Sequence, residues 1–127
     1  MAKPIIGITM GDPSGIGPEI IVKSLIKNNS YMNCSFLVIG NASHLKNTAR
    51  QYNLNININV CESIDEIRND SSSLINCLHI ENNLNNIEYG INSEIGGESS
   101  YQYIYKAVDL ALNNKIRAIC TAPISKK

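Results

Sequence analysis

The chain has 127 residues, of which 43% are hydrophobic, enough for one ordinary globular domain with a buried core. Lys and Arg together number 11, as do Asp and Glu, so the formal net charge is zero and no basic field would attract nucleic acid or an anionic membrane. There is no Trp and only one Phe, so the usual side chains for stacking nucleic-acid bases are nearly absent.

The first part of the chain predicts two strand–helix units. Residues 4–10 are an apolar run that ends at a glycine, which is typical of a buried strand. A helix is predicted over residues 18–28, because Pro suits the first helical position and apolar residues recur at i, i+4. A second strand is predicted at residues 35–40, followed by a helix that Asn41 would cap.

The middle of the chain predicts a strand, a short helix and a further strand. Residues 54–60 alternate strictly between apolar residues and Asn, which is typical of a half-exposed strand at the edge of a sheet. Ser63 and Glu66 have the spacing of a capping box, which predicts a helix over residues 64–69. Residues 76–81 predict another short strand.

The last third predicts a loop, a long helix and a strand. The Asn-rich residues 82–92 predict the loop. A helix is predicted over residues 98–112, with an apolar stripe facing the core. The stripe comprises Tyr101, Ile104, Tyr105, Val108, Ala111 and Leu112. Residues 117–121 predict a final strand.

Strands that alternate with helices at this spacing predict an α/β fold with a largely parallel sheet and crossover helices. There is no internal repeat and no domain boundary, so residues 1–127 are expected to form one α/β segment. The apolar run over residues 5–10 is too short for a membrane helix or a signal peptide. The sequence therefore predicts a cytoplasmic protein without a membrane partner.

The four cysteines are too far apart for a zinc ribbon or a redox pair. Cys34, Cys77 and Cys120 lie in or beside apolar runs, so we expect reduced, buried thiols. His44 is predicted on a helix surface and His79 in a strand. Neither has a Cys, Asp or Glu at ligand spacing, so no metal site is expected within this chain.

A segment rich in glycine and proline, residues 11–19 (GDPSGIGPE), joins the first strand to the first helix. In an open α/β sheet this is the ligand-binding side, where glycines admit a ligand and a helix N-terminus attracts an anion. Gly11, Asp12, Gly15 and Gly17 are therefore candidate cofactor contacts, with Asp12 also a candidate for orienting a substrate hydroxyl. The same residues suit a tight turn in which Asp12 bonds its own backbone.

A second segment, residues 120–126 (CTAPISK), begins at the carboxyl end of the last predicted strand and hence on the same rim of the sheet. Lys126 is a candidate contact for a phosphate or carboxylate, and Thr121 can donate a hydroxyl. An ordinary strand end with a solvated terminal lysine explains these residues equally well. Glu19, in the first helical turn, suits the helix dipole better than catalysis.

Residues 6–19 closely resemble the opening of the 4-hydroxythreonine-4-phosphate dehydrogenase family. Residues 96–111 look like the helix that precedes that family's Thr-Ala-Pro strand, and residues 121–126 resemble the strand's continuation. The resemblance therefore spans the chain from end to end. The opening and the Gly-Glu-Ser-Ser-Tyr segment look closer to the branch that acts on threonate or erythronate 4-phosphate than to the branch of pyridoxine biosynthesis.

This resemblance implies a fold similar to the isocitrate and isopropylmalate dehydrogenases and a cytoplasmic homodimer. It implies an NAD-dependent oxidation of a 4-phosphorylated hydroxy acid, such as 4-hydroxythreonine 4-phosphate, followed by loss of carbon dioxide. NAD would accept the hydride. A divalent metal would polarise the alcohol oxygen and stabilise the enolate that develops.

The family's pattern is only partly present. Ser125 stands where the family usually has Asn or His, which puts one substrate contact in doubt. The family's metal-binding histidines and its substrate-binding His-Thr pair lie beyond the matched segments. We therefore expect an incomplete, N-terminal part of the enzyme, shortened by a frameshift or a truncated gene model, which is inactive alone. The alternative is a non-catalytic phospho-ligand-binding protein, or one half of a split enzyme.

Overall fold

A computed structural model describes residues 3–28, 34–68, 74–81 and 94–122. Its five strands form one parallel sheet in the order β3-β4-β2-β1-β5. The strands are β1 (Ile5–Thr9), β2 (Ser35–Gly40), β3 (Asn57–Cys61), β4 (Leu74–His79) and β5 (Ala118–Thr121). The α/β fold with a largely parallel sheet is therefore confirmed.

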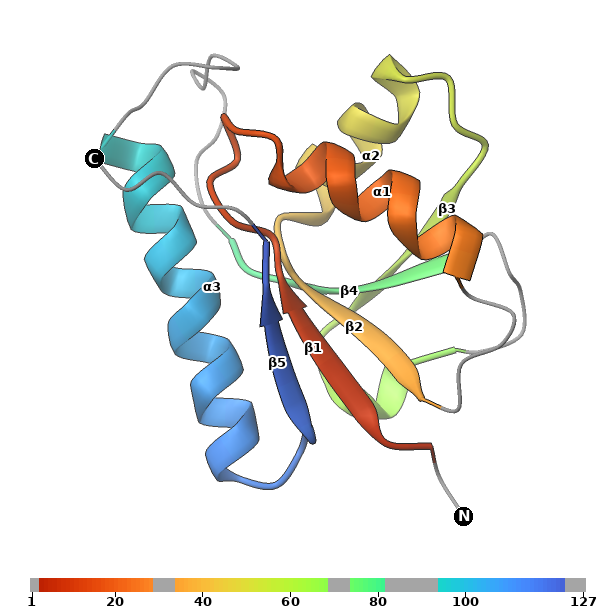
Figure 1. The fold of residues 1–127 in the computed structure, drawn as a ribbon. Coiled ribbons are helices and arrows are strands. Elements are labelled where there is room, and N and C mark those ends of the chain that lie inside the picture. Colours follow the sequence, from red (N-terminus) through yellow and green to blue (C-terminus); the bar gives the residue numbers. More distant parts are fainter. Residues whose placement is uncertain (1–2, 29–33, 69–73, 82–93, 123–127) are drawn as a thin grey trace.

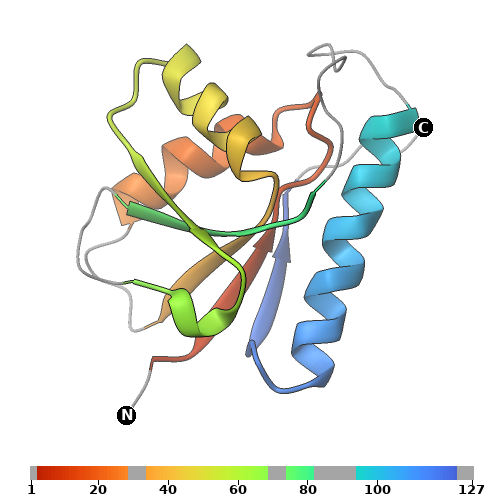
Figure 2. The ribbon, with the colours of Figure 1, turned by 180° about the vertical axis from the view of Figure 1, so that it is seen from behind.

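Three helices cover the two faces of this sheet (Figures 1 and 2). They are α1 (Gly17–Asn28), α2 (Ala42–Gln51) and α3 (Glu94–Leu112). α1 and α2 pack against each other on one face, and α3 lies alone on the other, against β1, β2 and β5. No helix among the described residues is both long and apolar enough to cross a membrane.

Most of the elements follow the sequence closely. β1, α1 and β2 form where they are predicted, and Asn41 caps α2 by accepting a hydrogen bond from the backbone N–H of His44 at 3.0 Å. The alternating segment forms β3, which begins three residues later than predicted and lies at one edge of the sheet as expected. The Asn-rich loop predicted at residues 82–92 lies outside the described residues.

The prediction of a capping box at Ser63 is wrong. The helix it predicted is a single 3-10 turn, η1 (Ile64–Glu66), and the Ser63 side chain makes no capping hydrogen bond. The Glu66 carboxylate instead accepts from the backbone N–H of Glu62 at 2.7 Å. β4 also begins and ends two residues earlier than predicted, because Leu74 and Ile75 pair with Asn57 and Ile58 of β3.

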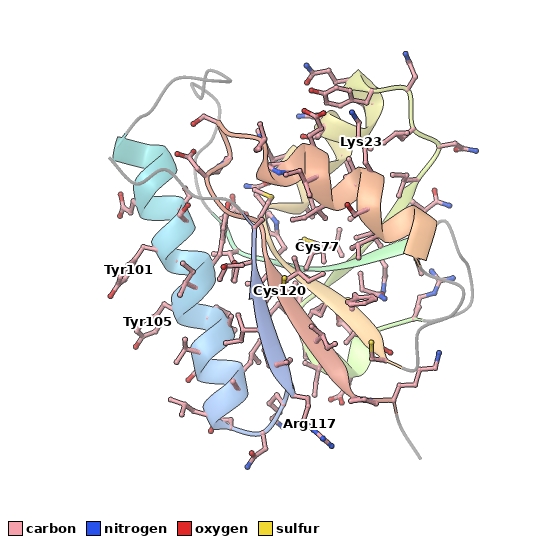
Figure 3. The ribbon with its side chains drawn as sticks, in the orientation of Figure 1. Lys23, Cys77, Tyr101, Tyr105, Arg117 and Cys120 are labelled. Atoms are coloured by element: carbon pink, nitrogen blue, oxygen red, sulfur yellow. The ribbon has the colours of Figure 1, made fainter. Side chains whose placement is uncertain are left out.

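The predicted core-facing stripe of α3 is also wrong, since Tyr101 and Tyr105 are 69% and 68% exposed. Figure 3 shows both rings pointing away from the sheet. The buried face consists instead of Tyr103, which is fully buried, and of the small residues Ser99, Ser100 and Ala107. Small residues let α3 lie close to the sheet around the one large ring. The helix also begins four residues earlier than predicted, so Gly97 lies inside it.

The four cysteines are free thiols, as expected, but their burial differs. Cys61 and Cys77 are buried, and burial raises the pKa of the Cys77 thiol to about 12, which keeps it protonated. Cys34 is half-buried. The prediction that Cys120 is buried is wrong, because this residue of β5, the other edge strand among the described residues, is exposed.

Asparagine ends two of the helices. Asn53 and Asn114 have left-handed backbones with φ of 55° and 59°, directly after α2 and α3. In each case the next residue donates its N–H back into the helix: Leu54 to the Ala49 carbonyl, and Lys115 to the Leu110 carbonyl. These are Schellman-type caps, in which Asn takes the position usually held by Gly.

Candidate functional site at the carboxyl edge of the sheet

The carboxyl ends of four strands meet at one rim of the sheet, and backbone hydrogen bonds continue just past them. Met10 donates to the Ile39 carbonyl at 3.0 Å, Ile80 to Gly40 at 2.8 Å, and Ala122 to Thr9 at 3.1 Å. Parallel strands place such ends together, and in open α/β sheets ligands bind there. This rim is therefore the candidate functional site.

The loop over residues 11–16 leaves β1 in a sharp turn. Gly11 has φ of 78°, a left-handed conformation that glycine adopts without strain. The Asp12 carboxylate accepts from the Ser14 backbone N–H at 2.9 Å and from the Ser14 hydroxyl at 2.7 Å. Asp12 and Ser14 are both 3% exposed. Asp12 thus organises its own turn, which is one of the two roles its sequence context allows.

Gly17 brings the two sequence motifs together. It opens α1 so close to the end of β1 that an added Cβ would overlap the Met10 carbonyl oxygen. The same Cβ would lie 3.3 Å from the Cβ of Ala122. The glycine-proline loop and residues 121–122 therefore share one rim, as predicted.

His44 fastens this loop to α2. Its Nε2–H donates to the Pro13 carbonyl at 2.7 Å, and the residue is only 8% exposed. The prediction that His44 lies on a helix surface is wrong, because the loop folds over that face of α2. Burial lowers the pKa of the His44 imidazole, while the hydrogen bond to Pro13 opposes that shift. The neutral ring is thus the form that the fold favours.

The N-terminus of α2 also lies at the rim, and the protein's own side chains occupy it. Asn41 accepts from the His44 N–H, and His79 Nδ1 accepts from the Ala42 N–H at 3.0 Å. His79 Nε2 in turn lies 3.0 Å from the Glu81 carboxylate. These side chains occupy the backbone N–H groups of Ala42 and His44 and hold β4 to α2. The N-terminus of α2 is therefore not an open site for an anion.

Glu19 is engaged in a surface cluster that joins α1 to α2. Its carboxylate accepts from Lys23 at 2.7 Å and from the Tyr52 hydroxyl at 2.8 Å, and the Lys23 ammonium lies 4.4 Å from the centre of the Tyr52 ring. These hydrogen bonds, with Lys23 first, lower the pKa of the Glu19 carboxyl. The cluster fits a structural role for Glu19.

Two hydroxyls at the rim are buried without a hydrogen-bond partner among the described residues. They are Oγ1 of Thr9, at the end of β1, and Oγ of Ser100, on α3. Both residues lie in segments that resemble the family, but the sequence does not indicate which hydroxyls are buried without a partner.

The structure thus places Gly11, Asp12 and Gly15 in one loop and Gly17 at the start of α1. Only Gly15 and Ile16 of residues 11–17 reach the surface appreciably, and Ile16 is 59% exposed. Lys126 and Ser125 lie outside the described residues. No group of three His, Cys, Asp or Glu side chains in the described part of the chain is placed to hold a metal ion.

Replacing His44 with Ala is expected to lower the free energy of unfolding by about 1–3 kcal/mol, because it leaves the buried Pro13 carbonyl unpaired. Since the folded pKa of His44 is depressed, its contribution is complete above the unfolded value of about 6.5 and is lost as the pH falls through the folded value. Urea denaturation across this range should show stability falling on acidification, with a shallower fall in H44A. An unchanged slope in H44A would contradict this role.

Comparison with known proteins agrees with the architecture. The family described as pyridoxal phosphate biosynthetic protein PdxA matches residues 32–127. The D-threonate 4-phosphate dehydrogenase of Cupriavidus necator is 38% identical over 124 residues, which cover 98% of this chain and 37% of that protein.

Two solved structures share the fold. The 4-hydroxythreonine-4-phosphate dehydrogenase of Burkholderia phymatum superimposes with a TM-score of 0.91 at 40% identity, over 99% of this chain and 38% of that one. The enzyme of the same name from Klebsiella pneumoniae gives 0.88 at 30% identity, over 97% and 38%. The chain thus spans little more than a third of the length of the relatives it matches.

Proposed function

We propose a function from the premise that this chain belongs to the pyridoxal phosphate biosynthetic protein PdxA family. The chain is proposed to be the N-terminal segment of an NAD-dependent, metal-assisted dehydrogenase that acts on a 4-phosphorylated hydroxy acid. The proposed substrate is D-threonate 4-phosphate, the compound named for the relative from Cupriavidus necator. The complete enzyme is proposed to work in the cytoplasm as a homodimer.

One observation carries this proposal: the packing of Gly17 against Met10 and Ala122. It joins the two segments that resemble the family at one rim, where a ligand cleft forms in α/β sheets. The loop with Gly11, Asp12, Gly15 and Gly17 forms part of the cleft wall. Its exposed part, Gly15 and Ile16, faces the NAD or the substrate, while Asp12 holds the shape of the turn.

In the proposed reaction, the substrate's secondary alcohol loses a proton and transfers a hydride to NAD, and the keto acid then loses carbon dioxide. The described residues contribute binding surface and exclude water from the rim. They do not fit a metal site, since no suitable cluster of ligands occurs among them. The divalent metal therefore belongs to residues outside this part of the chain. Lys126 is proposed to contact the phosphate of the substrate.

A chimera tests the proposal. This chain would replace the matching segment of the Cupriavidus necator enzyme, and NADH formation would be followed with D-threonate 4-phosphate and with 4-hydroxythreonine 4-phosphate. We expect turnover by the chimera, with preference for the threonate compound, and none by the 127-residue chain alone. To test the proposed phosphate contact, Lys126→Gln would be made in the chimera, where it should raise KM more than it lowers kcat.

Two outcomes would overturn the proposal. Turnover by the 127-residue chain alone would show that it needs no further residues. A folded chimera that binds phosphorylated hydroxy acids but oxidises neither would favour the alternative, a non-catalytic phospho-ligand-binding protein.

A further inference from the structure

A pocket of about 390 Å³ lies between α2 and the segment that leads into β3. Its lining residues are Lys46, Ala49, Arg50, Leu54, Ile56, Asn57 and Ile58. None of them belongs to the rim described above. The volume lies within the range of small-molecule sites, roughly 300–1,000 Å³. The pocket is therefore a candidate second binding site.

Two cations stand on one side of the pocket. Lys46 and Arg50 are four residues apart on α2, so their side chains share a helix face with Ala49 between them. Among the described residues neither has a carboxylate partner, whereas Lys23 pairs with Glu19 and Lys106 with Asp109. Like charges at this spacing repel, so a bound anion would relieve the repulsion as well as satisfy the donors.

The opposite side of the pocket is apolar and held in place. Leu54, Ile56 and Ile58 are half-buried and pack against the core. The Schellman-type cap at Asn53 fixes this side, because Leu54 N–H donates to the Ala49 carbonyl at 2.9 Å. The pocket residues come from α2, from the segment that follows it and from β3, and α2 contacts β3.

We propose that this pocket binds a small organic anion, with its apolar body on Leu54, Ile56 and Ile58 and its phosphate or carboxylate between Lys46 and Arg50. Charge complementarity selects the anionic group, since Arg offers a planar fork of donors and Lys a mobile point charge. The apolar side selects the body. Asn57, which is exposed and lines the pocket, offers an additional amide group as a hydrogen-bond donor. The site is independent of the dehydrogenase cleft.

Hexyl phosphate is the probe for this proposal, with heptanoate to distinguish a carboxylate from a phosphate. Saturation-transfer NMR on the 127-residue protein would follow the probe and yield its Kd. The paired variant K46Q/R50Q removes both cations, and K106Q/K115Q removes two elsewhere. We expect the first to raise the Kd by about tenfold or more, because two charge-assisted hydrogen bonds are lost. The second should change it by less than about twofold, as expected for distant surface charges.

Two control ligands, tested on the unmutated protein, separate the contribution of the cations from that of the apolar side chains. Inorganic phosphate, which lacks the apolar body, and 1-hexanol, which lacks the charge, should each bind more weakly than hexyl phosphate. The proposal is overturned if 1-hexanol binds as well as hexyl phosphate, or if both double variants weaken binding equally. Circular dichroism would confirm that the exposed Gln substitutions leave the fold intact.

Discussion

Replacing Gly17 with Ala is expected to lower the free energy of unfolding by about 3 kcal/mol, the upper end of the usual range for overpacking. The added Cβ would overlap the Met10 carbonyl oxygen and crowd Ala122. Met10 cannot give way easily, because its N–H is bonded to Ile39 in the neighbouring strand. Urea denaturation followed by circular dichroism would measure the loss.

Gly97 provides the matched control. It also lies in a helix, but it is exposed, and an added Cβ would meet no atom of the described residues within 4 Å. Gly97→Ala should therefore stabilise the protein by about 0.5–1 kcal/mol, since Gly disfavours a helix interior. Equal changes in the free energy of unfolding of the two variants would contradict the close packing of Gly17 against Met10 and Ala122.

Replacing Tyr103 with Ala is expected to have the largest effect, about 3–5 kcal/mol, as for other large aromatic side chains in cores. Tyr103 is fully buried and is the largest of the fully buried side chains among the described residues. The variant would leave a cavity between α3 and the sheet. Thermal unfolding should show a lower Tm, and native gel filtration would show whether the folded form persists.

Tyr101→Ala on the same helix is the control. Tyr101 is 69% exposed, so the substitution should change the free energy of unfolding by no more than about 0.5 kcal/mol. The pair of variants decides between two orientations of α3. A large loss in Y101A with a small one in Y103A would restore the orientation that the sequence predicts.

Sequence patterns predicted most of the architecture, because a parallel sheet depends on features that are local. The apolar run of β2 is bounded by a glycine and a capping Asn, so its limits follow directly. The shared rim follows from the chain order of strands and helices alone. The alternating pattern predicted the edge position of β3 but not its faces, because Asn59 is hydrogen-bonded to Asn76 and Val60 is 44% exposed.

The side of α3 that faces the sheet could not be predicted in this way. Tyr101 and Tyr105 count as apolar in a periodic pattern, although a tyrosine hydroxyl is satisfied by water. The buried side is formed by Ser99, Ser100 and Ala107 around Tyr103, and such small residues carry almost no hydrophobic signal. What they provide is close approach, which only the packed structure reveals.

The contacts of the candidate site were likewise beyond sequence patterns. His44 and Pro13 are 31 positions apart, and their hydrogen bond depends on how the loop folds over α2. His79 is expected in a strand and does end β4, but its role as a cap for Ala42 links elements that are distant in the chain.

The position of β1 inside the sheet has a consequence for synthesis of the protein. β1 pairs with β2 on one side and with β5 on the other, and β5 begins at Ala118, more than a hundred residues after β1 ends. At typical elongation rates a ribosome needs on the order of ten seconds to reach β5. During that interval the open edge of β1 is a template for pairing with other nascent chains, and a chaperone that covers it would raise the yield of folded protein.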